Sequence, residues 1–152
     1  MPALTVQEYI DYARQRLVWY EDFQLAGEYM TPALAEFCDQ LLIRRDSSHD
    51  TFVAFIPADG LSAQQLAAIQ QAFRTFGRTY HLSPQRTHIV VAVFVASAPD
   101  AQTAEEIQTL TQGPDPEVRQ TFLGWMVDLQ NQAVHPHAGP PSEKPILRCL
   151  SQ

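Results

Sequence analysis

The spacing of hydrophobic residues alternates between strand-like and helical in the central part of the chain. Residues 51–56 (TFVAFI) and 87–97 (THIVVAVFVAS) are short runs of β-branched and aromatic residues, which predict strands. The second run is apolar on both faces, as in a strand that is covered on both sides. Residues 121–129 (TFLGWMVDL) predict another strand, and Gln130-Asn131 predicts a turn after which residues 132–135 return beside it.

Helical spacing separates these predicted strands. Ser62-Ala63-Gln64-Gln65 predicts a capping box, and Gly77 is expected to end that helix in the left-handed conformation. The next helix is expected to begin at Asp100 or at Thr103, where residues 103–106 resemble a further capping box. A chain in which strands and helices alternate in this way is expected to join neighbouring parallel strands by right-handed crossover connections. We therefore predict an α/β fold, with a small, mostly parallel sheet of three to five strands and helices packed on it in a single domain.

The N-terminal part predicts further helices. Thr5-Val6-Gln7-Glu8 is a capping-box pattern, followed by Tyr9, Ile10, Ala13 and Leu17 at helical spacing. Residues 19–30 have no clean period and are compatible with a continued helix or with a turn at Gly27. Thr31-Pro32 predicts a second helix that ends near Arg44 or Arg45. The alternative makes residues 41–45 a strand paired with the next segment; the helix is preferred because its apolar face spans more than two turns.

The last residues differ in character. The run PHAGPPSEKP holds four prolines and no periodic signal, which predicts an extended linker. We therefore expect an α/β domain over residues 1–135 and a proline-rich linker or tail over residues 136–152.

Composition and charge exclude several function classes. The net charge is −7 and no cluster of Lys and Arg is present, so neither nucleic acid nor anionic lipid is an expected partner. Cys38 and Cys149 are too few for a disulfide framework and predict free thiols in a reducing compartment. With no secretory signal and no apolar stretch of about 20 residues, the sequence predicts a cytoplasmic protein.

Catalytic motifs are absent from the sequence. No glycine-rich phosphate loop follows any predicted strand, and no serine lies in a nucleophile elbow, so we expect no cofactor and no catalytic residue. Ser47, Ser48, His49 and Asp50 are adjacent, which prevents a triad geometry and favours a polar turn. His135 and His137 lack further ligands nearby, so a solvated pair is favoured over a metal site.

Two groups of residues remain as candidates for binding. Asp59 and Asp100 follow, and Asp128 lies near, the C-terminal end of a predicted strand, where open parallel sheets bind ligands. Turn and cap roles for Asp59 and Asp100, and a hairpin border at Asp128, are the simpler explanation. Trp19, Tyr20 and Phe23 lie in the least regular region. Burial in the core is the default for such residues, but exposed aromatics there would form an interaction surface.

Residues 89–134 suggest a family resemblance. The runs IVVAVFVASAPDAQTAEEIQTL and FLGWMVDLQNQAV resemble the cytosolic N-terminal domain of some bacterial rhomboid-type intramembrane proteases, in strand, helix, strand order and in the ending Val127-Asp128-Leu129-Gln130-Asn131. The resemblance covers under a third of the chain and carries over no catalytic residue.

The resemblance implies a non-catalytic accessory domain, tethered through its proline-rich tail. Its partner would be another protein or its own downstream membrane segment, and an oligomer stays open. The alternative is a stand-alone small enzyme or ligand-binding protein with its site at the C-terminal edge of the sheet.

Overall fold

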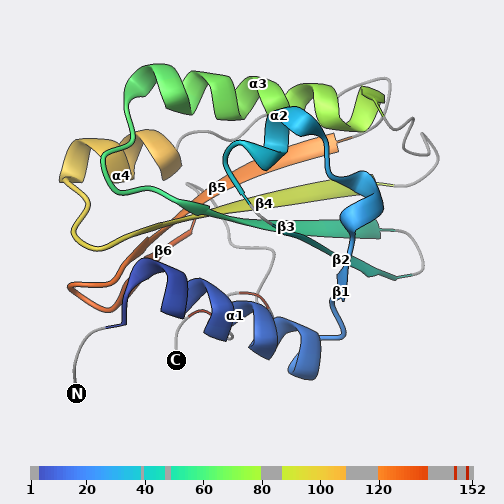
Figure 1. The fold of residues 1–152 in the computed structure, drawn as a ribbon, viewed down its shortest axis with the longest axis horizontal. Helices are drawn as coiled ribbons and strands as arrows, with labels where there is room; N and C mark the ends of the chain where they lie inside the picture. The colour runs from blue at the N-terminus through green and yellow to red at the C-terminus, as the bar shows by residue number, and fades with distance from the viewer. Residues whose placement is uncertain are drawn as a thin grey trace.

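The computed structural model describes residues 4–38, 40–46, 49–79, 87–108 and 120–136, together with Ile146 and Leu150. In this part of the chain a mixed sheet runs through the molecule, with helices on both of its faces (Figure 1). Its six strands follow one another in sequence order across the sheet: β1 (Gln24–Leu25), β2 (Leu41–Arg45), β3 (His49–Pro57), β4 (Thr87–Ala96), β5 (Gln120–Asp128) and β6 (Ala133–His135).

The central strands β3, β4 and β5 are parallel, whereas β1, β2 and β6 pair antiparallel to their neighbours. The α/β class, the three central strands and the returning strand after Gln130-Asn131 are thus confirmed. The prediction of a mostly parallel sheet of at most five strands is wrong, because short antiparallel strands extend the parallel core at both edges.

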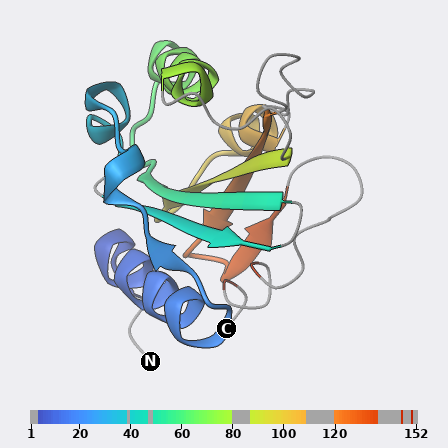
Figure 2. The same cartoon turned by 90° about the vertical axis from the view of Figure 1, so that its right-hand side faces the viewer.

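The crossover helices α3 (Ala63–Thr79) and α4 (Ala101–Gln108) lie on the same face of the sheet, as Figure 2 shows from the side. Two connections of the same hand between successive strands require this arrangement. The opposite face is covered by α1 (Val6–Tyr20), whose capping box is present as predicted: Glu8 N–H donates to the Thr5 hydroxyl at 3.1 Å, and Thr5 N–H donates to the Glu8 carboxylate at 3.0 Å.

Strand residues divide between two cores according to the alternation of side chains along a strand. Phe52, Ala54 and Ile56 of β3 pack under α3, while Val53 and Phe55 face α1. Both faces of the central strands are therefore buried, as their continuous apolar sequence predicts.

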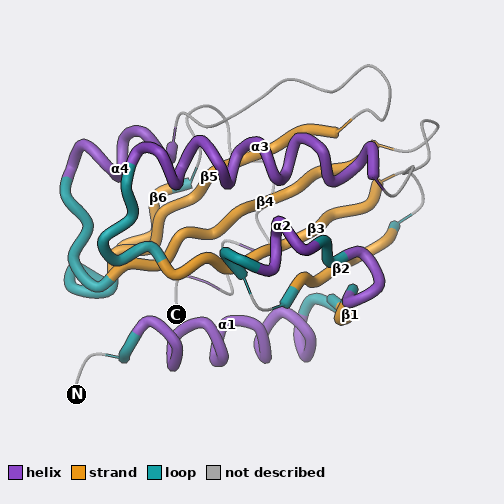
Figure 3. Tube along the Cα trace, turned by 45° about the horizontal axis from the view of Figure 1, so that its top comes forward, coloured by secondary structure: helices purple, strands orange, loops and turns teal. Residues whose placement is uncertain are grey.

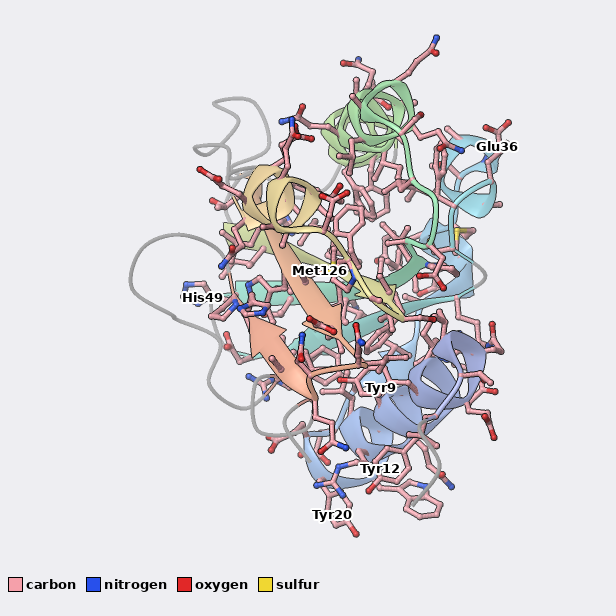
Figure 4. All side chains as sticks on the ribbon, turned by 90° about the vertical axis from the view of Figure 1, so that its left-hand side faces the viewer. Tyr9, Tyr12, Tyr20, Glu36, His49 and Met126 are labelled. Atoms are coloured by element: carbon pink, nitrogen blue, oxygen red, sulfur yellow. The ribbon has the colours of Figure 1, made fainter. Side chains whose placement is uncertain are left out.

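The core beneath α1 also contains residues from the end of the chain. Ile146 and Leu150 are 0% and 2% exposed, and the Tyr9 hydroxyl donates to the Leu150 carbonyl at 2.9 Å. Figure 4 shows Tyr9 on the side of α1 that faces the sheet. The predicted linker over residues 136–152 otherwise lies outside the described residues.

The predicted second helix is wrong over most of its length. Thr31 does cap α2, since Leu34 N–H donates to its hydroxyl at 3.1 Å, but α2 covers only Pro32–Ala35. Residues 41–45 form β2, antiparallel to β3, as in the alternative interpretation. Leu41 and Ile43 face one core and Leu42 the other, so burial on both faces removed the alternation that would have marked a strand.

Two further boundaries differ from expectation, and a third follows the first of its two expected alternatives. α1 ends at Tyr20, and the chain turns at Asp22 (φ 59°) into β1 and a 3₁₀ turn (Gly27–Tyr29). α3 continues past Gly77 to Thr79. Thr103 does not begin α4: Asp100 caps it, because Thr103 N–H donates to the Asp100 carboxylate at 2.7 Å. None of the helices in the described ranges is both long enough and apolar enough to cross a membrane.

Candidate functional site

The three aspartates beyond the parallel strands are engaged within their own turns or caps. Asp59 accepts hydrogen bonds from the Ser97 amide at 2.8 Å and the Ser97 hydroxyl at 2.9 Å, which joins the loops after β3 and β4. Asp128 accepts from the backbone and side-chain amides of Asn131 at 3.1 and 2.7 Å. Asp100 caps α4, and the Thr103 backbone N–H lowers the pKa of its carboxyl below the ordinary value.

These hydrogen bonds fit the turn and cap roles that the sequence also allowed. The described residues contain no group of three or more His, Cys, Asp or Glu side chains placed to hold a metal ion. His135 is half-buried on β6, while His137 lies outside the described residues. A ligand site at Asp59, Asp100 and Asp128 therefore stays a prediction that would require these carboxylates to exchange their present partners.

The opposite edge of the parallel strands carries a row of charged residues that the sequence analysis missed. Asp50, expected in a polar turn, lies in β3 beside Arg45 of β2 and His88 of β4. The His88 Nδ1 lies 3.4 Å from the Asp50 Oδ2, and the Arg45 Nε lies 3.9 Å from the Asp50 Oδ1. Ser47 and Ser48 lie outside the described residues.

Burial limits what this row can do. His88 is 1% and Asp50 6% exposed, so both are sealed from water at the start of their strands. The Tyr29 hydroxyl, which accepts a hydrogen bond from Arg45, extends the row under Phe76 of α3. The arrangement anchors β2, β3 and β4 to one another, and the His88 imidazole is too buried to meet a substrate. The signal in the sequence was a polar residue at the start of each of two otherwise apolar strands.

The aromatic group at the end of α1 divides between surface and core. Trp19 and Tyr20 are 67% and 66% exposed, whereas Phe23 is 1% exposed and packs in the core beneath the Arg44 guanidinium, 5.4 Å from its ring centroid. Burial, the default expectation, therefore holds for Phe23 and is wrong for Trp19 and Tyr20. Phe23 cannot contribute directly to an interaction surface.

Arg16 orders the outer face of α1. Its guanidinium lies 5.5 Å from the Tyr12 ring centroid and 5.4 Å from that of Tyr20, and it donates to the Tyr12 hydroxyl at 3.2 Å. Figure 4 shows Tyr12 and Tyr20 on the side of α1 turned away from the sheet. Cation–π contacts of this kind hold the two rings in place on the helix surface.

A shallow groove of about 350 Å³ runs beside these aromatics, between α1 and the strands β1 and β2. Val18 and Trp19 form its α1 side, while Leu25 and the buried Leu42 form its strand side. Arg14, whose side chain is 12% exposed, also lines the groove and forms an ion pair with Asp11 at 2.6 Å. The remaining lining residues are Gln15 and Gln40. The lining therefore combines apolar side chains with a charged pair and two glutamines.

The chain matches no family model, and searches of curated proteins and of solved structures returned no significant match. The resemblance to rhomboid N-terminal domains accordingly stays a prediction.

Proposed function

We propose that this chain is a non-catalytic protein-interaction domain that binds its partner through the groove between α1 and β1. The observation that carries the proposal is the exposure of Trp19 and Leu25, 67% and 63%, beside an apolar hollow that they line together with Val18. Tyr20, which is 66% exposed, follows Trp19 on the outer side of α1. Exposed apolar side chains that gather at one place on a surface often mark an interaction site.

Pre-ordering supports the same proposal. Binding costs entropy when long side chains must be immobilised. Trp19 has few rotatable bonds, so it loses little freedom when it is covered, and the adjacent Tyr20 is already held by Arg16. Trp, Tyr and Arg are also the residues that most often dominate binding energy at protein interfaces.

The proposal extends to the context of the domain. A cytosolic accessory domain of a larger, membrane-anchored protein would use this surface to contact another protein or its own downstream membrane segment, as the resemblance to rhomboid N-terminal domains implies. A tether would then begin after Leu150, since Ile146 and Leu150 belong to the core. The alternative, a stand-alone ligand-binding protein with its site at Asp59, Asp100 and Asp128, has weaker support because those carboxylates are already hydrogen-bonded.

Site-specific photo-cross-linking tests the interaction function. Benzoylphenylalanine replaces Tyr20 in the full chain, produced in its native host, and a matched chain carries it at Gln64, which is exposed on α3 across the sheet. We expect a discrete protein adduct from position 20 and none from position 64. The additional change Trp19→Ala should remove the adduct while altering the free energy of unfolding by less than about 0.5 kcal/mol, because this side chain is mostly exposed. Equal adducts at both positions, or none at position 20, would contradict the proposal.

A further inference from the structure

The open edge of the sheet indicates which kind of partner fits the groove. β1 is the edge strand on this side, and Figure 3 shows it beside the C-terminal end of α1. The Ala26 N–H donates to the Leu41 carbonyl at 2.8 Å, and Gln24 is paired with Ile43. Backbone groups in an antiparallel pair alternate in direction. Gln24 and Ala26 therefore turn their N–H and C=O groups toward β2, while Leu25 turns both of its groups outward.

The side chain of Leu25 faces the groove. Leu25 is paired with Leu42, whose side chain packs in the core beneath α1, so both side chains lie on the α1 face of the sheet. The outward N–H and C=O of Leu25 thus lie directly beside the apolar hollow formed with Val18 and Trp19. Hydrogen-bonding groups and an apolar pocket at the same position are what an added strand requires.

The two edges of the sheet are protected differently. Natural sheets guard their edges with charged residues, proline or covering segments. At the far edge, β6 is followed directly by Pro136, whose carbonyl accepts a hydrogen bond from the Gln108 side chain of α4 at 3.1 Å. β1 contains only Gln24 and Leu25, so its short length is its protection; it carries neither charge nor proline, and Leu25 is 63% exposed. The open edge and the groove therefore coincide on one side of the molecule.

We infer that the partner segment is an extended peptide that adds to β1 as a further strand. The residue opposite Leu25 exchanges backbone hydrogen bonds with it and places an apolar side chain in the groove against Val18 and Trp19. Its two neighbours point to the other face, so the preferred sequence alternates between apolar and polar residues. The inference rests on the proposed interaction function and specifies its ligand.

Leu25→Pro provides a selective test. Proline lacks the N–H that an added strand needs, and edge strands tolerate it where that N–H points to solvent. The variant should keep its cooperative melting, whereas the matched variant Gln24→Pro, which removes an N–H facing β2, should melt at a clearly lower temperature. Leu25→Ala keeps the backbone donor and removes only side-chain contact.

The probe is a displayed library of random peptides of about ten residues, long enough to form a strand. After selection on the wild-type chain, we expect enriched peptides with apolar residues at alternate positions. Leu25→Pro and Trp19→Ala should each weaken their binding at least tenfold, and Leu25→Ala by a smaller factor. Gln64→Ala, at an exposed position of α3 on the other face of the sheet, should leave binding unchanged. In the wild-type chain, peptide binding should slow hydrogen exchange at the Leu25 amide, a measurement that does not depend on the stability of any variant.

Any of four results would overturn the extended-strand inference. These are enriched peptides with helical spacing, binding that survives Leu25→Pro, a Leu25 amide that the bound peptide does not protect, and a library without enrichment. Adducts at position 20 in the cross-linking experiment would still support the interaction function in each of these cases. Failure of both experiments would remove the function and its ligand together.

Discussion

Replacing Ile146 by alanine tests whether the C-terminal segment is part of the fold or only a linker. The Ile146 side chain is completely buried beneath α1, together with Leu150 and the strand residues Val91 and Val93. An isoleucine buried in this way loses about 2–5 kcal/mol of unfolding free energy when it is truncated to alanine, because apolar contact is lost and a cavity is left. A segment that serves only as a linker would show a change below about 0.5 kcal/mol.

The structure allows an intermediate value within that range. The loss within that range depends on how far the surrounding side chains relax into the cavity. We expect a loss of about 3 kcal/mol, which for a domain of this length lowers the melting temperature by about 6–12 °C. Tyr9→Phe removes the hydrogen bond to the Leu150 carbonyl and should lower the free energy of unfolding by about 1 kcal/mol.

Urea unfolding followed by tryptophan fluorescence and by circular dichroism measures the difference. Leu25→Ala is the matched control, since it shortens an apolar side chain that is 63% exposed and should change the unfolding free energy by less than about 0.5 kcal/mol. If Ile146→Ala behaved like this control, the C-terminal segment would contribute nothing to the core, and the boundary predicted after residue 135 would be correct.

Two predictions concern charged groups. His88→Leu should destabilise the chain by about 3 kcal/mol because Asp50 stays buried without its neighbour, and a double-mutant cycle in urea with Asp50→Leu should give a coupling of at least about 1 kcal/mol; additive effects would refute the contact. For Asp100, a lowered pKa in the folded state means that its stabilisation is present above the ordinary value of 3.8 and is lost as the pH falls through the lowered pKa. Asp100→Asn should therefore lose less melting temperature than wild type between about pH 6 and pH 2, and equal losses would contradict the capping role.

Local patterns determined the central part of the fold. The Thr5 and Ser62 capping boxes formed as predicted, since they depend only on residues one turn apart. The three parallel strands were recognisable because continuous apolar runs of that length have few other stable environments. The placement of α3 and α4 on one face followed from the preferred hand of the crossovers.

Only tertiary structure decided the edges of the sheet. The apolar side chains of residues 41–43 fit a helix and a strand equally well, and pairing with β3 selected the strand. Asp50 and His88 are ordinary polar residues in the sequence, and the parallel register between their strands brings them together. No local signal contains that register.

The candidate binding surface shows the same division. The sequence identified an aromatic group at residues 19–23 but not which rings would be exposed. That depends on where α1 ends and on the turn at Asp22, which sends Phe23 into the core and leaves Trp19 and Tyr20 outside. The outward direction of the Leu25 backbone likewise exists only once β1 has paired with β2. Spacing along the chain determines which residues share one helix or strand, whereas contacts between distant segments determine which of their faces stay open to a partner.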